Sequence, residues 1–158
     1  MLRSGGDGFR SGEEAKVLGA ELVPAPDTVA KALGVPEGVA VVQRERVYTD
    51  GQGVVALSAS WLPGPFAESA PELLDVTPLP TMTFGLIEER TGRRAVRRRD
   101  VVAIRPAPDD VAEILEVPAG TPVLTMTNCY WDQHGDVTEY AIDYLGSGRE
   151  LTADHELA

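Results

Sequence analysis

The sequence predicts an α+β domain with a mainly antiparallel sheet and its helices on one face, and an internal repeat is the main reason. Pro24–Leu62 aligns without a gap on Pro106–Tyr144. Each copy reads as a strand, a helix and a hairpin, and tight turns between consecutive strands require them to run antiparallel. Two copies are too few for a solenoid. We therefore expect one domain with a pseudo-two-fold axis.

The first copy is expected to contain a strand over 18–23, a helix over 27–33, and strands over 39–48 and 54–62 around a turn at 50–53. Asp27 is suited to the first turn of the helix, and Gly34 ends it. The strands alternate apolar and polar side chains, as half-buried strands do. Structure is expected from Val17, with 1–16 a flexible glycine-rich lead-in and 17–158 the domain.

The second copy is expected to contain a strand over 101–105, a helix over 109–115, and strands over 122–131 and 137–145. Between the copies, 63–80 is rich in proline and reads as a long loop of the kind that covers a site. A helix over 81–91 follows, closed by Gly92.

Composition argues against several classes of protein. The chain has 158 residues and a formal net charge of −11, which disfavours binding to a phosphate backbone. The exception is a basic cluster, which we interpret as a solvated helix end and strand face because no aromatic residues are interleaved with it. The cluster comprises Arg93, Arg94, Arg97, Arg98 and Arg99.

Targeting features are missing from the sequence. Cys129 is the only cysteine, so no intrachain disulfide can form. No apolar run approaches the roughly 18 residues that span a bilayer, and the N-terminus lacks the apolar core of a signal peptide. We expect a cytoplasmic protein that does not contact membranes.

Catalytic motifs are sparse. His134 lies in a predicted turn and His155 in the tail, and neither belongs to a catalytic triad or a metal-ligand pattern. The N-terminal glycines match no nucleotide-binding fingerprint. The sequence predicts a protein that is not an enzyme and that carries no cofactor and no metal.

Charged residues without a counterpart in the other copy are the strongest candidates for a binding site. Arg44 and Arg46 share one face of a strand and align with Met126 and Asn128. Two guanidinium groups suit a carboxylate or phosphate, although arginines that pair with exposed acids have the same pattern. Glu139 aligns with an apolar residue and suits ligand hydroxyl or amine groups, or simply an arginine partner. If the site is open to water, replacing Arg44 should hardly affect folding.

Hydroxyl side chains form a second group of candidates. Ser58 and Ser60 share one face of their strand, where they are either ligand contacts or polar filler. Thr81 and Thr83 stand at the start of the predicted middle helix, where free amides favour an anion. The alternative is an ordinary helix cap.

An ordered set of short segments resembles the UTRA domain, the effector-binding half of HutC-type regulators in the GntR superfamily. The segments are Val23–Pro26, Ala32–Gly38, Gln43–Tyr48, Ser60–Pro63, Leu86–Gly92, Ala112–Gly120 and Val137–Tyr140. The resemblance runs from about Val17 to Glu150 and implies the fold of chorismate lyase.

The resemblance also implies a function and a set of site residues. It implies a sensor of a small polar or anionic effector that forms homodimers and reaches DNA only through a winged-helix domain, for which the few residues before Val17 leave no room. The residues that it implies for the effector pocket are Arg44, Arg46, Thr81 or Thr83, and Glu139, with Thr83 or Phe84 where other members have an aromatic. A sugar phosphate is disfavoured, because Leu57–Ser58 replaces an acid found in members that bind one.

Two alternatives stay open at the level of sequence. One is a lyase on the same scaffold, with Arg44 and Arg46 gripping a carboxylate and Glu139 as general acid. The other is a structural dimerisation module whose pocket is filled by its own side chains.

Overall fold

The computed structural model describes residues 13–158, so most of the expected lead-in lies outside the described residues. The first strand, β1, begins at Glu14. The expected start at Val17 is therefore three residues late, because Glu14 and Lys16 pair with the neighbouring strand.

Six strands and five short helical segments make up the described fold. In chain order they are β1 (Glu14–Pro24), α1 (Asp27–Leu33), β2 (Ala40–Asp50), β3 (Gly53–Pro63), α2 (Phe66–Ser69), the 3-10 helix η1 (Pro71–Leu74), α3 (Thr83–Thr91), β4 (Ala95–Pro106), α4 (Asp109–Leu115), β5 (Pro122–Asp132) and β6 (Val137–Leu145).

All six strands form one antiparallel sheet in the order β1-β2-β3-β6-β5-β4. In the repeat, β1, β2 and β3 correspond to β4, β5 and β6, so the strands follow one another in the same order from either edge of the sheet. The pseudo-two-fold axis therefore passes between β3 and β6, where Ser60 lies opposite Ala141. The predicted α+β class, antiparallel sheet and internal repeat are confirmed.

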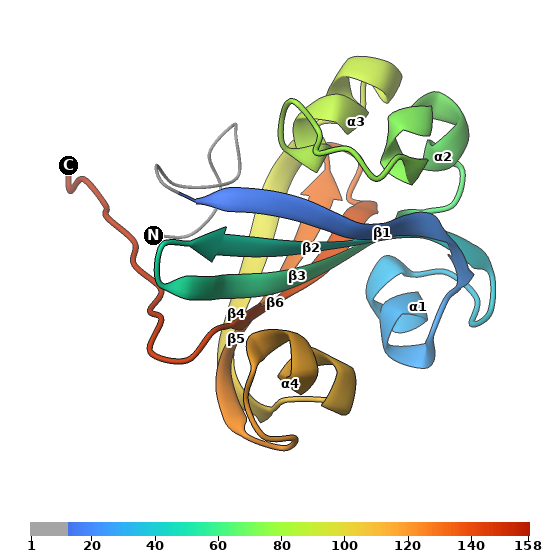
Figure 1. The fold of residues 1–158 in the computed structure, drawn as a ribbon. Helices are drawn as coiled ribbons and strands as arrows, with labels where there is room; N and C mark the ends of the chain where they lie inside the picture. Colours follow the sequence, from blue (N-terminus) through green and yellow to red (C-terminus); the bar gives the residue numbers. More distant parts are fainter. Residues whose placement is uncertain (1–12) are drawn as a thin grey trace.

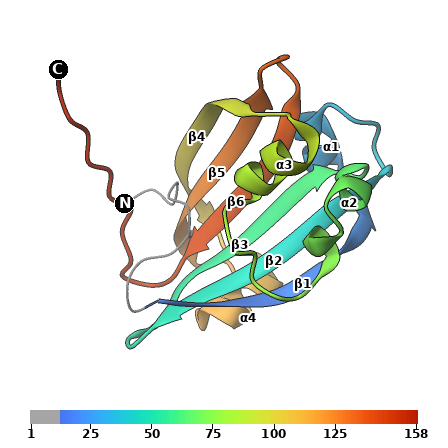
Figure 2. The same ribbon diagram turned by 90° about the horizontal axis from the view of Figure 1, so that it is seen from above.

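The helices lie on both faces of the sheet, so the expectation that they share one face is wrong. Figures 1 and 2 show α2 and α3 on one side of the sheet and α1 and α4 on the other. Neighbouring residues of β2 follow the alternation of a strand: Val41 packs against α1, whereas Val42 packs against α2, η1 and α3. The sequence showed the repeat, but the segment between the copies has no counterpart and covers the second face.

Three apolar clusters hold these layers together. Phe66, Leu73 and Ile87 join α2, η1 and α3 to the sheet. Val29 and Leu33 attach α1, and Val111 and Leu115 attach α4. Burial of such side chains contributes about 1.5–3 kcal/mol each. We call the face covered by α2, η1 and α3 the inner face and the other one the outer face.

The segment between the copies is more structured than the loop that was expected over 63–80. It holds α2 and η1, which bury Phe66 and Leu73. The helix expected from residue 81 begins at Thr83, and the strand expected over 101–105 extends over Ala95–Pro106. Patterning did not reveal the first half of β4, because the three arginines at 97–99 break the alternation of apolar and polar residues.

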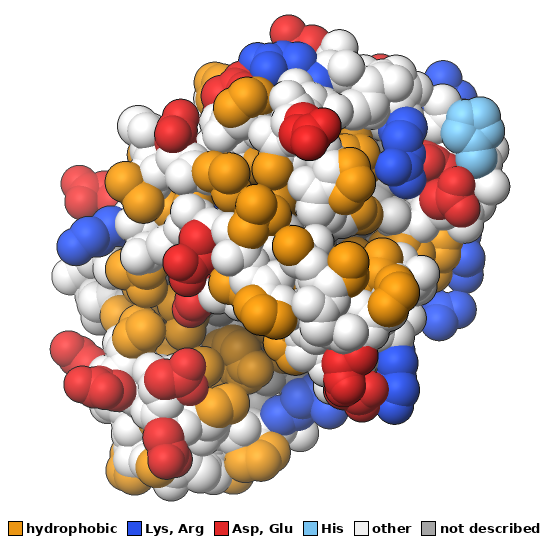
Figure 3. All heavy atoms as spheres, turned by 90° about the vertical axis from the view of Figure 1, so that its right-hand side faces the viewer, with side chains coloured by type: hydrophobic (Ala, Val, Ile, Leu, Met, Phe, Trp, Pro, Cys, Tyr) orange, Lys and Arg blue, Asp and Glu red, His pale blue; other side chains and the backbone are white. Residues whose placement is uncertain are grey.

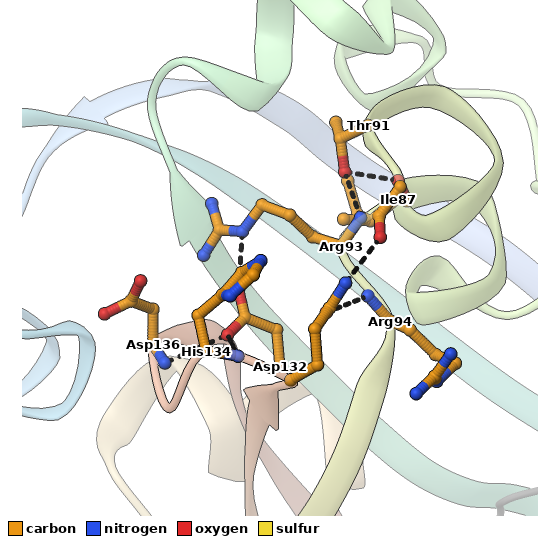
Figure 4. Close-up of polar contacts among 9 residues, drawn as sticks. Ile87, Thr91, Arg93, Arg94, Asp132, His134 and Asp136 are labelled. Atoms are coloured by element: carbon orange, nitrogen blue, oxygen red, sulfur yellow. Dashed lines mark hydrogen bonds and ion pairs between the residues drawn. The ribbon is translucent and has the colours of Figure 1, made fainter.

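Each hairpin tip is tied down by an arginine from another part of the chain. The Asp132 side chain is buried and accepts a hydrogen bond from Arg93 Nε at 2.7 Å, and its other oxygen accepts the amides of His134 and Asp136 (Figure 4). In the first copy, Arg149 donates two hydrogen bonds to Asp50 at 2.6 and 2.7 Å. Equivalent tips are thus held by non-equivalent arginines.

Glycines end β3 and β6 at equivalent positions of the repeat. A Cβ atom at Gly64 or at Gly146 would lie 2.3 Å from a main-chain carbonyl oxygen. Only glycine lets the chain pass so close, because any side chain would clash with a main-chain atom that cannot move away.

Candidate functional site

Alternate residues of β2 and β3 place polar side chains on the inner face. Arg44 lies opposite Ser60 in the register, and Arg46 lies opposite Ser58. Because alternate residues of a strand share a face, these four side chains point toward the layer that holds η1 and α3. The sequence predicted that each pair shares a face of its own strand, and the register joins the two pairs.

Arg44 is fully buried, and it binds the main chain of the covering segment. Its Nη1 donates to the carbonyl oxygens of Leu73 at 2.8 Å and Asp75 at 2.9 Å, and its Nη2 donates to Thr77 at 3.3 Å. Burial, aided by the nearby Arg46 charge, lowers the pKa of Arg44 to about 10. Since both Nη atoms have partners, Arg44 fixes the protein's own chain at one end of residues 75–82, which we call the strap. Its Nε, like that of Arg46, is buried without a hydrogen-bond partner among the described residues.

This arrangement changes the expectation for Arg44 in one respect. The side chain is not open to water, and it supports a segment of the fold. Replacing it cannot be neutral for folding, because several carbonyl groups would lose a charged partner.

Arg46 is better placed to bind a ligand. Its Nη2 donates to Ser60 Oγ at 2.6 Å. Its Nε is buried and has no hydrogen-bond partner among the described residues. A buried donor without a partner is costly and uncommon in folded proteins. Arg46 therefore has a donor available for an acceptor that is not part of the described chain.

Glu139 belongs to the central strand β6 and lies beside Arg46 of β2. It is 6% exposed. Burial raises the pKa of this carboxyl group to about 7, although the Arg46 charge and a hydrogen bond from Ser60 act to lower it. Ser60 thus links the guanidinium group of Arg46 to the carboxyl group of Glu139. Near neutral pH, Glu139 is poised between its neutral and charged forms.

A cavity of about 80 Å³ lies between these side chains and the strap. Its lining comes from β1, β2, β6, the strap and the start of α3: Ala15, Val17, Arg44, Arg46, Tyr48, Pro78, Leu79, Thr81, Met82, Thr83 and Glu139. Pockets for small molecules usually have volumes of about 300–1,000 Å³. The strap therefore lies close to the sheet in this structure.

Thr81 and Thr83 both line the cavity. Thr83 is the first residue of α3 and is buried, whereas Thr81 precedes the helix. No side chain caps α3, whose N-cap residue is Met82. The amides at the start of α3 can therefore attract an anion.

Three of the expected site residues do not line the cavity. Ser58 donates a hydrogen bond to Asp143 at 2.5 Å in a buried position. Ser60 accepts the hydrogen bond from Arg46 described above. Phe84 stacks on Tyr130 with ring centroids 5.6 Å apart and lines a separate hollow near Arg98. The structure brings together Arg44, Arg46, Thr81, Thr83 and Glu139, while their binding of a ligand stays a prediction.

Sequence reasoning missed Tyr48, which lines the cavity, and Asp143, which lies four residues after Glu139 on the same face of β6. Asp143 acts to raise the pKa of Glu139 further. The period of two along β6 was a signal that could have identified Asp143. Tyr48 gave no such signal, because it has a tyrosine counterpart in the second copy.

The outer face has a hollow of its own, of about 250 Å³, where α1 leaves part of the sheet uncovered. Trp131, Tyr140 and Arg99 contribute to its lining. Figure 3 shows hydrophobic side chains around a hollow on the side of the molecule that it displays. Within residues 13–158, no helix is long and apolar enough to cross a membrane, and no cluster of three or more potential metal ligands occurs.

The chain is similar to known regulators in sequence and in fold. It is 26% identical over 129 residues to the HTH-type transcriptional regulator Rv0792c of Mycobacterium tuberculosis, which covers 82% of this chain. The chain spans about half the length of that relative, 47%.

Solved structures share the fold. The ligand-binding domain of a GntR-family regulator from Bordetella bronchiseptica superposes with a TM-score of 0.75 at 23% identity, covering 99% of this chain and 98% of the other. A transcriptional regulator from Streptomyces coelicolor superposes with a TM-score of 0.71 at 28% identity, covering 87% and 88%. The model of the UTRA domain matches residues 12–148, and the chain belongs to the UTRA domain family.

Proposed function

We propose that this chain is the effector-binding domain of a GntR-type transcriptional regulator of the HutC kind, and that its effector is a small anionic or polar molecule bound beneath the strap. The observation that carries the proposal is the buried Nε of Arg46, which has no partner among residues 13–158 and lies beside Glu139 at the cavity. The relatives that match the chain are regulators and regulator ligand-binding domains, and they support this function over catalysis.

The cavity supports an effector with an anionic group and at least one further polar group. Arg46 and the amides at the start of α3 attract negative charge. The hydroxyl groups of Thr81 and Thr83 can donate or accept hydrogen bonds. Glu139 can donate while it is protonated, and it repels an anion once it is ionised. An anionic effector should therefore bind more tightly below pH 7 than above it.

Movement of the strap is the proposed signal. An effector larger than a few atoms cannot enter a cavity of about 80 Å³ unless the strap is displaced. The strap is continuous with α3 and is fixed by Arg44 at its other end. Binding would thus be transmitted to α3, in a homodimer whose DNA contacts are made by a separate winged-helix domain.

A thermal-shift screen tests the proposal and at the same time searches for the effector. The panel comprises inorganic phosphate, sugar phosphates, amino acids and organic acids. A compound present at about 100 times its Kd should raise the free energy of unfolding by about 2.7 kcal/mol. Incubation with chorismate provides the test for a lyase: sustained turnover would contradict a purely sensory function.

Calorimetric titration of the best compound into variants then tests the site. Arg46→Met should weaken binding about 10- to 100-fold, because it removes a hydrogen-bonding charge worth about 1.5–3 kcal/mol. Arg94→Met is the matched control, since Arg94 is exposed and lies outside the cavity lining. Equal affinity in Arg46→Met and the control would place the binding site elsewhere.

A further inference from the structure

The hollow on the outer face lies where the two copies of the repeat place side chains of different size at equivalent positions. Ile114 of α4 and Val47 of β2 pack against the apolar cluster that attaches α4 to the sheet. The residues equivalent to them are Ala32 of α1 and Cys129 of β5, which are smaller. Both of these line the hollow of about 250 Å³. The α1 side of the outer face thus leaves open a space that the α4 side fills with side chains.

Three neighbouring strands form the floor of this hollow. Arg99 of β4 pairs with Cys129 of β5, and Cys129 pairs with Tyr140 of β6. Trp131 is two residues further along β5 than Cys129 and therefore takes the same face. Both aromatic side chains are half-buried, and both line the hollow. The floor offers two aromatic rings beside one guanidinium group.

Positive charge without an acidic partner gathers around these rings. The guanidinium carbon of Arg97 lies 4.1 Å from the centre of the Trp131 ring, and that of Arg99 lies 5.7 Å from it. Burial raises the pKa of Tyr140, and the nearby charge of Arg105 opposes that rise. None of these three arginines forms an ion pair within residues 13–158. On a chain with a net charge of −11, they make this face a local attractor for anions.

The size and the lining of the hollow match a small aromatic acid. A cavity of about 150 Å³ is large enough for benzene, so a hollow of about 250 Å³ admits one ring together with an acidic group. Trp131 and Tyr140 suit contact with a ring, and the guanidinium group of Arg99 suits a carboxylate, which it can bind through two parallel hydrogen bonds. An inorganic anion would gain nothing from the two rings.

We propose that the outer hollow is a second binding site and that it takes a small aromatic carboxylate. The carboxylate lies against Arg99, and the ring lies between Ala32, Trp131 and Tyr140. This site shares no lining residue with the cavity beneath the strap, which is on the other face of the sheet. The inference goes beyond the proposed effector and does not depend on it.

The single cysteine of the chain serves as a reporter for this site. Cys129 lines the hollow, is half-buried and is the only thiol. Alkylation of the wild-type protein by iodoacetamide, followed by mass spectrometry, measures access to it. Cinnamate at about ten times its Kd should slow the alkylation about tenfold. Cinnamamide has the same ring without the charge and should protect far less.

The concentration range sets the limit of this test. A Kd of about 1 mM corresponds to a weak site. Failure of cinnamate, benzoate and indole-3-acetate to protect Cys129 at about 5 mM would therefore overturn the proposal. Equal protection by cinnamate and cinnamamide would overturn the role of the charge and the proposed ligand class with it.

Two substitutions test the charge and the space separately. Arg99→Met should raise the apparent Kd of cinnamate about 10- to 100-fold, and Arg94→Met is the matched control because Arg94 is exposed and lies outside the hollow. Each variant is scored by the ratio of its rates with and without cinnamate, because Arg99 also lowers the pKa of the Cys129 thiol, against the effect of burial. An equal Kd in the two arginine variants would overturn the proposal.

Ala32→Ile gives α1 the residue that α4 has at the equivalent position. It should fill the hollow, so that alkylation of Cys129 is slow without cinnamate and cinnamate has no further effect. Protection by cinnamate as in the wild type would contradict the position of the ring. The arginine variants change only exposed side chains, so their result holds even if Ala32→Ile does not fold.

A variant of the inner cavity separates this inference from the effector proposal. Arg46→Met should leave protection by cinnamate unchanged, because Arg46 lies on the other face. Loss of protection in Arg46→Met but not in Arg99→Met would place the aromatic acid beneath the strap and overturn the second site. Protection of Cys129 that rises with protein concentration alone would assign the hollow to a second copy of the chain and overturn it too. Failure of the effector proposal, by contrast, would leave protection of Cys129 unaffected.

Discussion

The two copies of the repeat place different side chains at the same buried position of the same strand. Arg44 in β2 and Met126 in β5 are 0% and 2% exposed, respectively. Arg44 has main-chain carbonyl groups to bind because the first copy is followed by η1 and the strap. The second copy is followed by the C-terminal tail, which does not cover β5. A buried arginine is thus stable only where the neighbouring chain supplies acceptors.

The next pair of equivalent residues differs in the same way. Arg46 has a donor free beside the cavity, whereas Asn128 donates to Asp100 at 2.5 Å within its own half. Asp100 also pairs with Arg98 at 2.9 Å. Asn128 thus has its partner within the second half, whereas Arg46 in the first half keeps a donor without a partner among the described residues. The comparison indicates that the strap, rather than the repeated scaffold, forms the cavity.

The largest effect is expected when the first copy is made to resemble the second at this position. Arg44→Met keeps an apolar stem but removes the hydrogen bonds to the strap, each worth about 1.5–3 kcal/mol to a charged donor. The free energy of unfolding should fall by about 3–5 kcal/mol. Urea unfolding measures the loss.

Met126→Leu is the matched control for Arg44→Met and should cost about 1.5 kcal/mol at most, since it conserves volume. Limited proteolysis should also cleave Arg44→Met within the strap before the wild type. Equal stability of Arg44→Met and wild type would show that the strap does not depend on Arg44.

The second effect concerns Glu139, whose counterpart in the first copy is Leu57. Its pKa rises on folding from an ordinary value of 4.5 to about 7. The folded state therefore binds more protons in this range, and stability is lost as the pH rises from about 4.5 through 7. Relative to Glu139→Gln, the wild type should lose about 3 kcal/mol over this window.

Urea unfolding of both proteins at half-unit pH steps measures the difference attributable to Glu139. A difference that does not change between pH 4.5 and 8 would mean that Glu139 is not poised near neutrality. The pH dependence expected for effector binding would then fail with it.

The smallest effect lies at the ends of two equivalent helices. Gly34 after α1 and Glu116 after α4 both adopt the left-handed conformation, with φ of 70° and 61°, respectively. A residue with a side chain adopts it at a cost of about 1–2 kcal/mol. Glu116→Gly should therefore raise the free energy of unfolding by up to about 1 kcal/mol, and Gly34→Ala should lower it by a similar amount. Thermal unfolding of the two variants measures both changes. A Glu116→Gly variant less stable than the wild type would contradict backbone strain at Glu116.

The sequence by itself determined the parts of the fold that depend on local pattern. The gapless repeat led to the pseudo-two-fold sheet, and tight turns at 50–53 and 132–135 led to antiparallel pairing. The period of two placed Arg44 and Arg46 on one face of their strand, and Ser58 and Ser60 on one face of theirs. These inferences succeeded because turn chemistry and alternation act over a few residues.

Only the tertiary structure decided what these side chains do. Pattern shows which face of a strand a residue takes, but not which distant segment covers that face. The covering segment turned Arg44 from an expected ligand contact into an anchor for the strap, and it left the Nε of Arg46 without a partner in the described chain. It also raised the pKa of Glu139, since burial depends on contacts between residues far apart in sequence. The local sequence pattern does not show which distant residues come into contact. These contacts form the cavity between the sheet and the strap.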